Sequence, residues 1–223
     1  AVAVTSIVLI TSWGGTEIAW MSIQMFGLAA LAVVSSVLFV WAESRAAEPI
    51  IPLSLFRNRD FTLSTIAALL IAVAMFGAIA YLPTYLQMVN GLSATNAGFL
   101  MIPLIAGIML TSILSGQLAT KTGRYKWMPI AGLSILAVSL VLLSTLTVDT
   151  PLWITSSYLF MMGAGIGFAQ QILVLVVQNS FPNAIVGTAT AGNNFFRELG
   201  ASIGTAIVGA LFSTRLADLL AER

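Results

Sequence analysis

The 223-residue chain is 59 % hydrophobic and 8 % charged, with a mean hydropathy of +1.01 and a formal net charge of +1. A soluble domain carries roughly 25 % charged residues, so lipid must be the solvent for much of this surface. The near-neutral charge gives no reason to expect a nucleic-acid partner. These residues include no cysteine and no histidine, which excludes disulfides, thiolate chemistry and imidazole proton transfer among them. Any proton chemistry here must use carboxylates or water.

Apolar segments long enough to cross the hydrocarbon core, about 20 residues, recur along the chain. No sustained alternation of apolar and polar residues indicates strands, so we predict an all-α membrane protein, a polytopic bundle of about seven spans. The expected spans are 1–11, 21–41, 61–86, 95–119, 127–147, 151–177 and 187–213. The chain begins inside an apolar run without a Met, so we expect part of a longer protein rather than a signal peptide.

The basic residues predict the orientation of these spans. Alternation places the connectors 42–60, 120–126 and 178–186 on one side of the membrane. The opposite side holds two basic residues, Arg215 and Arg223, whereas the first side holds six: Arg45, Arg57, Arg59, Lys121, Arg124 and Lys126. An excess of Lys and Arg marks the cytoplasmic side, so we assign these three connectors to the cytoplasm.

A short basic connector, Gly116-Gln-Leu-Ala-Thr-Lys-Thr-Gly-Arg-Tyr-Lys126, joins two of the spans. Gly116 has no side chain, so another helix can approach it closely. Gly123 can take the left-handed conformation that turns the chain. Three cations suit the carbonyl end of the preceding helix: Lys121, Arg124 and Lys126. We interpret the string as a cytoplasmic hinge; an ordinary positively charged loop is the alternative.

This string resembles the loop motif of the major facilitator superfamily, whose pattern is G-x-x-x-D/N-R/K-x-G-R/K-R/K. Thr120 stands where the motif has an acidic or amide residue, and Tyr125 interrupts the final basic pair. The second half of such transporters often carries a weakened copy, so the resemblance implies that this is the second-half copy. Thr120 argues against a charge-relay latch at this loop.

Two further stretches are similar to the fourteen-helix drug:proton antiporters of that superfamily. Residues 43–61 resemble the linker before the C-terminal six helices, and residues 81–98 resemble the first outer hairpin of that half. The resemblance implies a missing N-terminal bundle as a partner, together with membrane lipids and a small amphipathic substrate. It divides the chain into two inserted helices at 1–41, a cytoplasmic linker at 42–60, five helices of the C-terminal bundle at 61–213, and the start of an outer loop at 214–223.

Polar side chains interrupt the last expected span: Asn193, Asn194, Arg197 and Glu198. Charges within a membrane are costly and indicate a functional site by default. The face that carries Asn193 and Arg197 continues in small residues, Gly200 and Gly204, so it should meet protein or a water-filled cavity. Arg197 and Glu198 are sequence neighbours and point about 100° apart, so we expect each to pair elsewhere.

Glu198 is the only deep carboxylate among the expected spans. We hypothesise that it carries a proton or binds a cationic substrate; an interhelical structural bond is the alternative. Gln170 and Gln171 can face a central cavity, and Tyr81 and Tyr85 can line its outer mouth. Aromatic residues near helix ends are often interfacial anchors instead.

Glycines and prolines predict where helices meet or bend. Gly163-Ala-Gly-Ile-Gly167 lacks the last glycine of a dinucleotide-binding turn and indicates a close helix contact. Pro83 and Pro103 lie inside apolar segments, which they should bend.

The leading functional prediction is proton-coupled export of amphipathic, cationic drugs across a bacterial plasma membrane by alternating access. The proton gradient would supply the energy, with no cofactor and no metal site. One alternative is a same-fold exporter of a lipid or metabolite, and another is a non-transporting membrane scaffold or assembly partner. An enzyme is not expected, because no catalytic constellation of Ser, Asp or Lys is visible.

Overall fold

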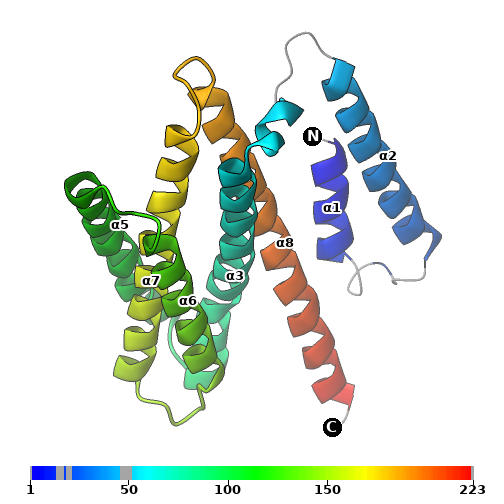
Figure 1. Ribbon diagram of the computed structural model, residues 1–223. Coiled ribbons are helices and arrows are strands. Elements are labelled where there is room, and N and C mark those ends of the chain that lie inside the picture. The colour runs from blue at the N-terminus through cyan, green and yellow to red at the C-terminus, as the bar shows by residue number, and fades with distance from the viewer. Residues whose placement is uncertain (1, 14–17, 19–21, 46–51, 222–223) are drawn as a thin grey trace. The chain divides into compact units, whose positions relative to one another are not determined.

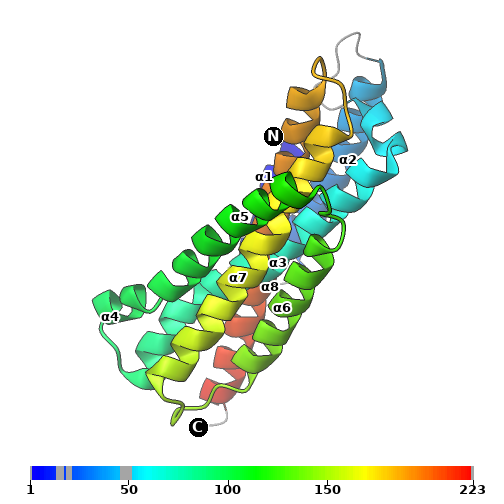
Figure 2. The same cartoon turned by 60° about the vertical axis from the view of Figure 1, so that its left-hand side comes forward.

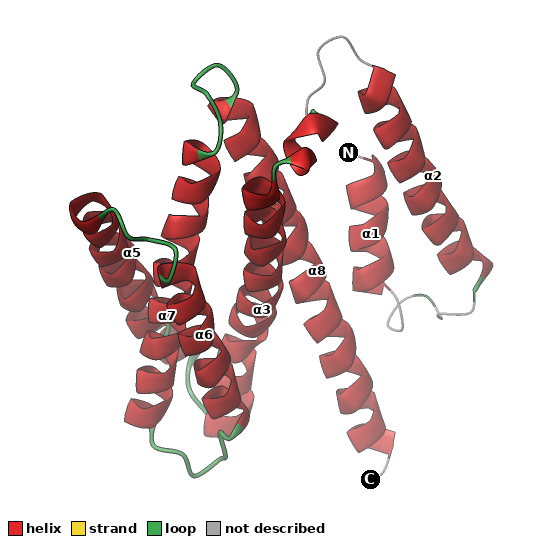
Figure 3. Ribbon diagram, in the orientation of Figure 1, coloured by secondary structure: helices red, strands yellow, loops and turns green. Residues whose placement is uncertain are grey.

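The computed structural model describes residues 2–13, 18, 22–45 and 52–221, so residues 46–51 of the expected linker and Arg223 lie outside the described residues. Every regular element within these ranges is a helix (Figure 3), which confirms the all-α class. The helices are α1 (Val2–Trp13), α2 (Ile23–Arg45), the 3-10 helix η1 (Leu53–Arg57), α3 (Arg59–Asn90), α4 (Ala94–Phe99), α5 (Ile102–Thr122), α6 (Met128–Ser144), α7 (Leu152–Asn179) and α8 (Val186–Ala221).

Length and composition allow five helical stretches of the described chain to cross a membrane. They are Ile23–Arg45, Arg59–Met88, Ala94–Thr122, Leu152–Asn179 and Val186–Phe212. The apolar helix α6 has 17 residues, which at 1.5 Å per residue reach about 25 Å. The remaining expected span, 1–11, corresponds to the 12-residue α1.

Helix ends differ from the prediction at several places. The helix α2 continues through residues 42–45 of the expected linker, and α3 begins at Arg59 inside it. Residues 214–221, expected to begin an outer loop, continue α8 as far as Ala221. Pro103 does not bend a long helix, because it lies in the first turn of α5, after the separate short helix α4. A proline needs no hydrogen-bond acceptor for its nitrogen in a first turn, so it starts a helix there without cost. Pro83, by contrast, lies inside α3.

The chain divides into two compact units, of which the second comprises residues 82–179. In this unit α7 packs against both α5 and α6 (Figure 2). A Cβ atom on Gly163 of α7 would overlap the carbonyl oxygen of Leu104 on α5, and one on Gly165 would lie 2.6 Å from the nitrogen of Leu136 on α6. The predicted glycine contact is confirmed, because these residues bring helix backbones together.

The first unit comprises residues 1–81 and 180–223. Its α3 and α8 run in the same direction (Figure 1), since Leu69 lies against Gly200 and Val73 lies against Gly204 one turn further on. Both contacts join the glycine to the main chain of α3, so no side chain separates the helices there. The helix α1 packs against α2 and α8 in the same unit.

Candidate functional site

The amide of Asn193 is held at the interface between α3 and α8. Its Nδ2 donates a hydrogen bond to Oγ1 of Thr65, with a nitrogen–oxygen distance of 3.2 Å. Asn193 is 2 % exposed and Thr65 is 3 % exposed, so this is a buried polar contact between helices. Together with Gly200 and Gly204, Asn193 forms a face of α8 that meets protein, as the sequence predicts. The structure thus gives Asn193 an interhelical packing role.

Arg197 and Glu198 form an ion pair with each other. Nη2 of Arg197 lies 2.9 Å from Oε1 of Glu198, with the two side chains 29 % and 63 % exposed. The prediction that each would pair elsewhere is wrong for these residues. Although the two Cβ atoms point about 100° apart, the long, flexible arginine side chain reaches back to the neighbouring carboxylate. The carboxylate is left open to its surroundings on its other side.

Glu198 lies near the middle of the membrane-crossing stretch Val186–Phe212. At 1.5 Å per residue it is about 18 Å along the helix from Val186. Ser202, one turn later, donates its hydroxyl to the Glu198 carbonyl at 3.1 Å. When this stretch crosses a membrane, a mid-span position puts the ion pair within the hydrocarbon core, where a charged side chain is costly without a partner.

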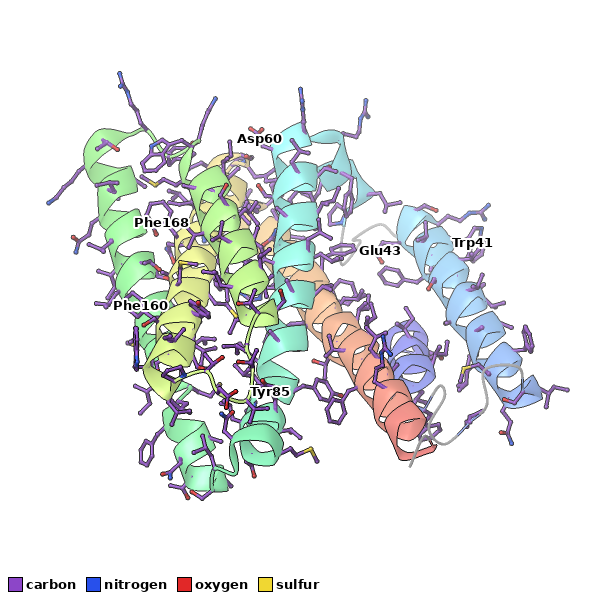
Figure 4. All side chains as sticks on the ribbon, turned by 90° about the horizontal axis from the view of Figure 1, so that it is seen from below. Trp41, Glu43, Asp60, Tyr85, Phe160 and Phe168 are labelled. Carbon is purple, nitrogen blue, oxygen red and sulfur yellow. The ribbon has the colours of Figure 1, made fainter. Side chains whose placement is uncertain are left out.

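The remaining predicted side chains divide between the two units. In the first, Asn194 is half-buried, and Tyr81 packs on α8 with its ring 5.7 Å from that of Phe212 and its hydroxyl over Gly209. In the second unit Tyr85 (Figure 4) and Gln170 are half-buried, and Gln171 is exposed. Tyr81 thus contacts α8 within its own unit.

The connector around Gly123 turns as the sequence predicts. Gly123 has a φ of +64° and ends α5, and its N–H donates to the Ala119 carbonyl at 3.0 Å. Lys121, Arg124 and Lys126 are all exposed. The following residue, Trp127, packs on Phe168 of α7 with ring centroids 5.8 Å apart. The hinge is therefore a capped helix end that presents three cations to solvent.

Within the described part of the chain, no helix approaches Gly116 closely. A Cβ atom there would reach only Cγ of Gln171, at 4.0 Å, which is ordinary van der Waals contact. In this unit the backbone approaches occur at Gly107 of α5 and Gly132 of α6 instead, where an added Cβ would clash with α7. Neither Gly107 nor Gly132 belongs to a glycine motif in the sequence. Each must be glycine only because it lies against the backbone of α7.

The sequence did not predict a chain of aromatic rings that includes Phe195 and Phe196, the two residues before Arg197. Phe61 pairs with Phe56 and Phe181, and Phe196 pairs with Phe56 and Phe195, with centroids 5.2–5.7 Å apart and planes nearly perpendicular. We call these five residues the phenylalanine cluster. The one sign of this cluster that the sequence offers locally is the spacing of two phenylalanines, Phe56 in the linker and Phe61 at the start of α3. In the described ranges, no group of three or more His, Cys, Asp or Glu side chains could hold a metal ion.

The chain belongs to the Major Facilitator Superfamily, because the family model matches residues 1–205. It is 44 % identical over 95 % of its length to an uncharacterized MFS-type transporter of Mycobacterium tuberculosis, and covers 31 % of that protein. It is 38 % identical over its whole length to the multidrug transporter protein MdtP of Bacillus subtilis, covering 41 %. It is 34 % identical over 94 % of its length to a tetracycline resistance determinant of Streptomyces rimosus, covering 60 %.

These relatives are transporters rather than enzymes, and the chain spans only about a third to three fifths of their lengths. The apolar helices and the family together define an integral membrane protein, and the bacterial relatives fit a location in the plasma membrane.

Proposed function

We propose that these residues form the C-terminal part of a fourteen-helix, proton-coupled transporter that exports amphipathic cations by alternating access. In this assignment α1 and α2 are the inserted pair, residues 42–60 form the linker, and α3 to α8 supply most of the C-terminal bundle. Two relatives named for multidrug transport and tetracycline resistance support drug export.

The observation that carries the proposal is the position of Glu198. Its carboxylate lies near mid-span, is bound on one side by Arg197, and has a side chain that is 63 % exposed. Secondary transporters bind substrate and coupling ion near the bilayer midplane. An ion pair held by one neighbour, rather than sealed between helices, leaves an oxygen available to a proton or to a cationic ligand. Asn193, buried against α3, holds the same helix in place.

Transport by the complete protein in proteoliposomes tests the proposal. We expect an imposed pH gradient to drive uptake of the lipophilic cation ethidium into inside-out vesicles, and Glu198→Gln to slow it at least tenfold. The matched control is Asp149→Asn, which removes an exposed carboxylate in the connector between α6 and α7. If vesicles with Glu198→Gln transport ethidium at the wild-type rate, Glu198 does not bind the proton or the cationic substrate.

The same assay separates the alternatives. Equal uptake with and without the pH gradient contradicts proton coupling. Movement of labelled phospholipid or of a neutral metabolite, but not of ethidium, identifies the same-fold exporter of another substrate class. Absence of any transport by a correctly folded, complete protein favours the membrane scaffold.

A further inference from the structure

The phenylalanine cluster connects the linker to the helix that carries the ion pair. Phe56 of η1 lies edge-on to Phe61 of α3, with centroids 5.2 Å apart and planes at 78°, and edge-on to Phe196 of α8, at 5.7 Å and 85°. Phe181, from the loop before α8, joins Phe61 at 5.7 Å and 77°. Perpendicular ring pairs favour a definite geometry, so the part of the linker that contains Phe56 is docked on α3 and α8.

Polar contacts of Asn58 hold the C-terminal end of the same linker segment. Oδ1 of Asn58 accepts from the backbone N–H of Asp60 at 2.9 Å and of Phe61 at 3.3 Å, which caps the start of α3. Nδ2 of the same side chain donates to the Ser180 carbonyl at 3.4 Å, in the loop before α8. One residue thus binds the linker, α3 and the entrance to α8.

Burial shows that one side chain of the docked segment enters the core of its unit. Leu55 is 2 % exposed, whereas Leu53 at the start of the segment is 41 % exposed; Phe61 of α3, on which Phe56 packs, is 0 % exposed. At the other end of the linker, α2 packs on α1, and α1 packs directly on α8. The helices that precede the linker are therefore joined to α8 by the packing of α1, independently of η1.

We propose that the segment Leu53–Asn58 is a rigid clasp that stays docked on α3 and α8 when the transporter changes conformation, so that α3 and α8, with α1 packed on α8 and α2 packed on α1, move as one body. The inference rests on the proposed alternating-access function and adds which bundle the inserted pair follows. The relative movement of the cycle then occurs between this body and the rest of the transporter, and residues 53–58 do not detach from α3 and α8.

Cross-linking of the complete protein tests the clasp. These residues contain no cysteine, so with any cysteine elsewhere replaced, Phe56→Cys and Phe196→Cys supply the two thiols. A bifunctional methanethiosulfonate reagent, short enough to fill the space of the two rings, would join them. Asn58→Cys with Ser180→Cys is a second pair that keeps both rings. Phe56→Cys with Ile207→Cys is the control, because Ile207 lies about 16 Å further along α8 from Phe196.

The clasp predicts equal cross-link yields at low and high pH and with and without ethidium, and unchanged ethidium transport after cross-linking. The control pair should give no intramolecular product. Yields that depend on pH or ligand, no product for either test pair, or transport that stops on cross-linking and returns with reductant would each overturn the inference. Failure of the uncross-linked wild-type protein to transport any substrate instead contradicts the proposed function, and the yields still decide whether the segment opens.

Discussion

Gly204 of α8 and Val73 of α3 meet backbone to backbone. A Cβ atom on Gly204 would overlap the carbonyl oxygen of Val73, and Gly200 stands in the same relation to Leu69 one turn earlier. Helices in lipid associate through such close packing, because the hydrophobic effect does not distinguish a neighbouring helix from a lipid tail. These glycines therefore determine how closely α3 approaches the helix that carries Arg197 and Glu198.

Replacing Gly204 by alanine should separate α3 from α8. We expect Gly204→Ala to destabilise the protein by about 1–3 kcal/mol, the usual cost of overpacking, because the added atom meets main-chain atoms that cannot rotate away. The control is Gly187→Ala in the same helix, where a Cβ atom meets nothing within 4 Å. Thermal unfolding in detergent should show a lower Tm for Gly204→Ala only. Equal Tm values would show that the helices adjust freely.

The hydrogen bond between Asn193 and Thr65 should be measurable as a coupling between two helices. A double-mutant cycle of Asn193→Ala and Thr65→Val should give an interaction free energy of about 0.6–1.7 kcal/mol, the range for such bonds inside membranes. Reversible unfolding of the reconstituted protein supplies the free energies. Asn194→Ala, on the adjacent half-buried position, should not couple to Thr65→Val. Coupling of equal size for both asparagines contradicts the assignment of the bond.

The ion pair of Arg197 and Glu198 should contribute little to stability. In the proposed transport cavity the exposed sides of both side chains face water, where such pairs contribute about 0.2–1 kcal/mol. Against lipid, an unpaired Arg197 would instead cost about 2.5–3.5 kcal/mol. With water beside the pair, Glu198→Gln should leave the Tm close to that of the wild type, above the Tm of Asn193→Ala. A loss of transport in Glu198→Gln then reports on the carboxylate rather than on unfolding. If Glu198→Gln has the lower Tm of the two, the carboxylate is structural.

The turn at Gly123 should require glycine for conformational reasons. Its φ of +64° costs an ordinary L-residue about 1–2 kcal/mol, so Gly123→Ala should lower the Tm although a Cβ atom meets nothing within 4 Å. Gly123→Asn should recover part of the loss, because asparagine tolerates this conformation. Gly98→Ala in α4, which also adds a Cβ in open space, is the control without a positive φ and should be close to neutral.

The basic connector predicts a measurable membrane orientation. A single cysteine at Thr122 should react with an impermeant maleimide only from the cytoplasmic side, and one at Asp149 only from the outside. Changing Lys121, Arg124 and Lys126 together to Gln removes half of the six basic residues that predict the inner side. We expect part of the population to invert or insert incompletely. Labelling of Thr122→Cys from the outside in the otherwise wild-type protein contradicts the predicted orientation.

The sequence alone determined the class and most of the helices. Apolar stretches form helices in lipid whatever lies beside them, because the backbone must satisfy its hydrogen bonds internally. The turn at Gly123 was equally predictable, since the left-handed conformation is a local property of one residue. Local reasoning about Pro103 predicted that the apolar segment is interrupted there. It did not predict that a new helix, α5, starts at that point.

Contacts between helices were decided only by the tertiary structure. The sequence predicts a close helix approach at Gly116, and none occurs there among the described residues, whereas Gly107 and Gly132, which the sequence did not distinguish, lie where α7 leaves no room. The pairing of Arg197 with Glu198 depended on rotamers, and the docking of Phe56 on Phe196 joins residues 140 positions apart. Composition specifies that a helix needs a neighbour, but only the packed arrangement specifies which residue stands opposite each side chain.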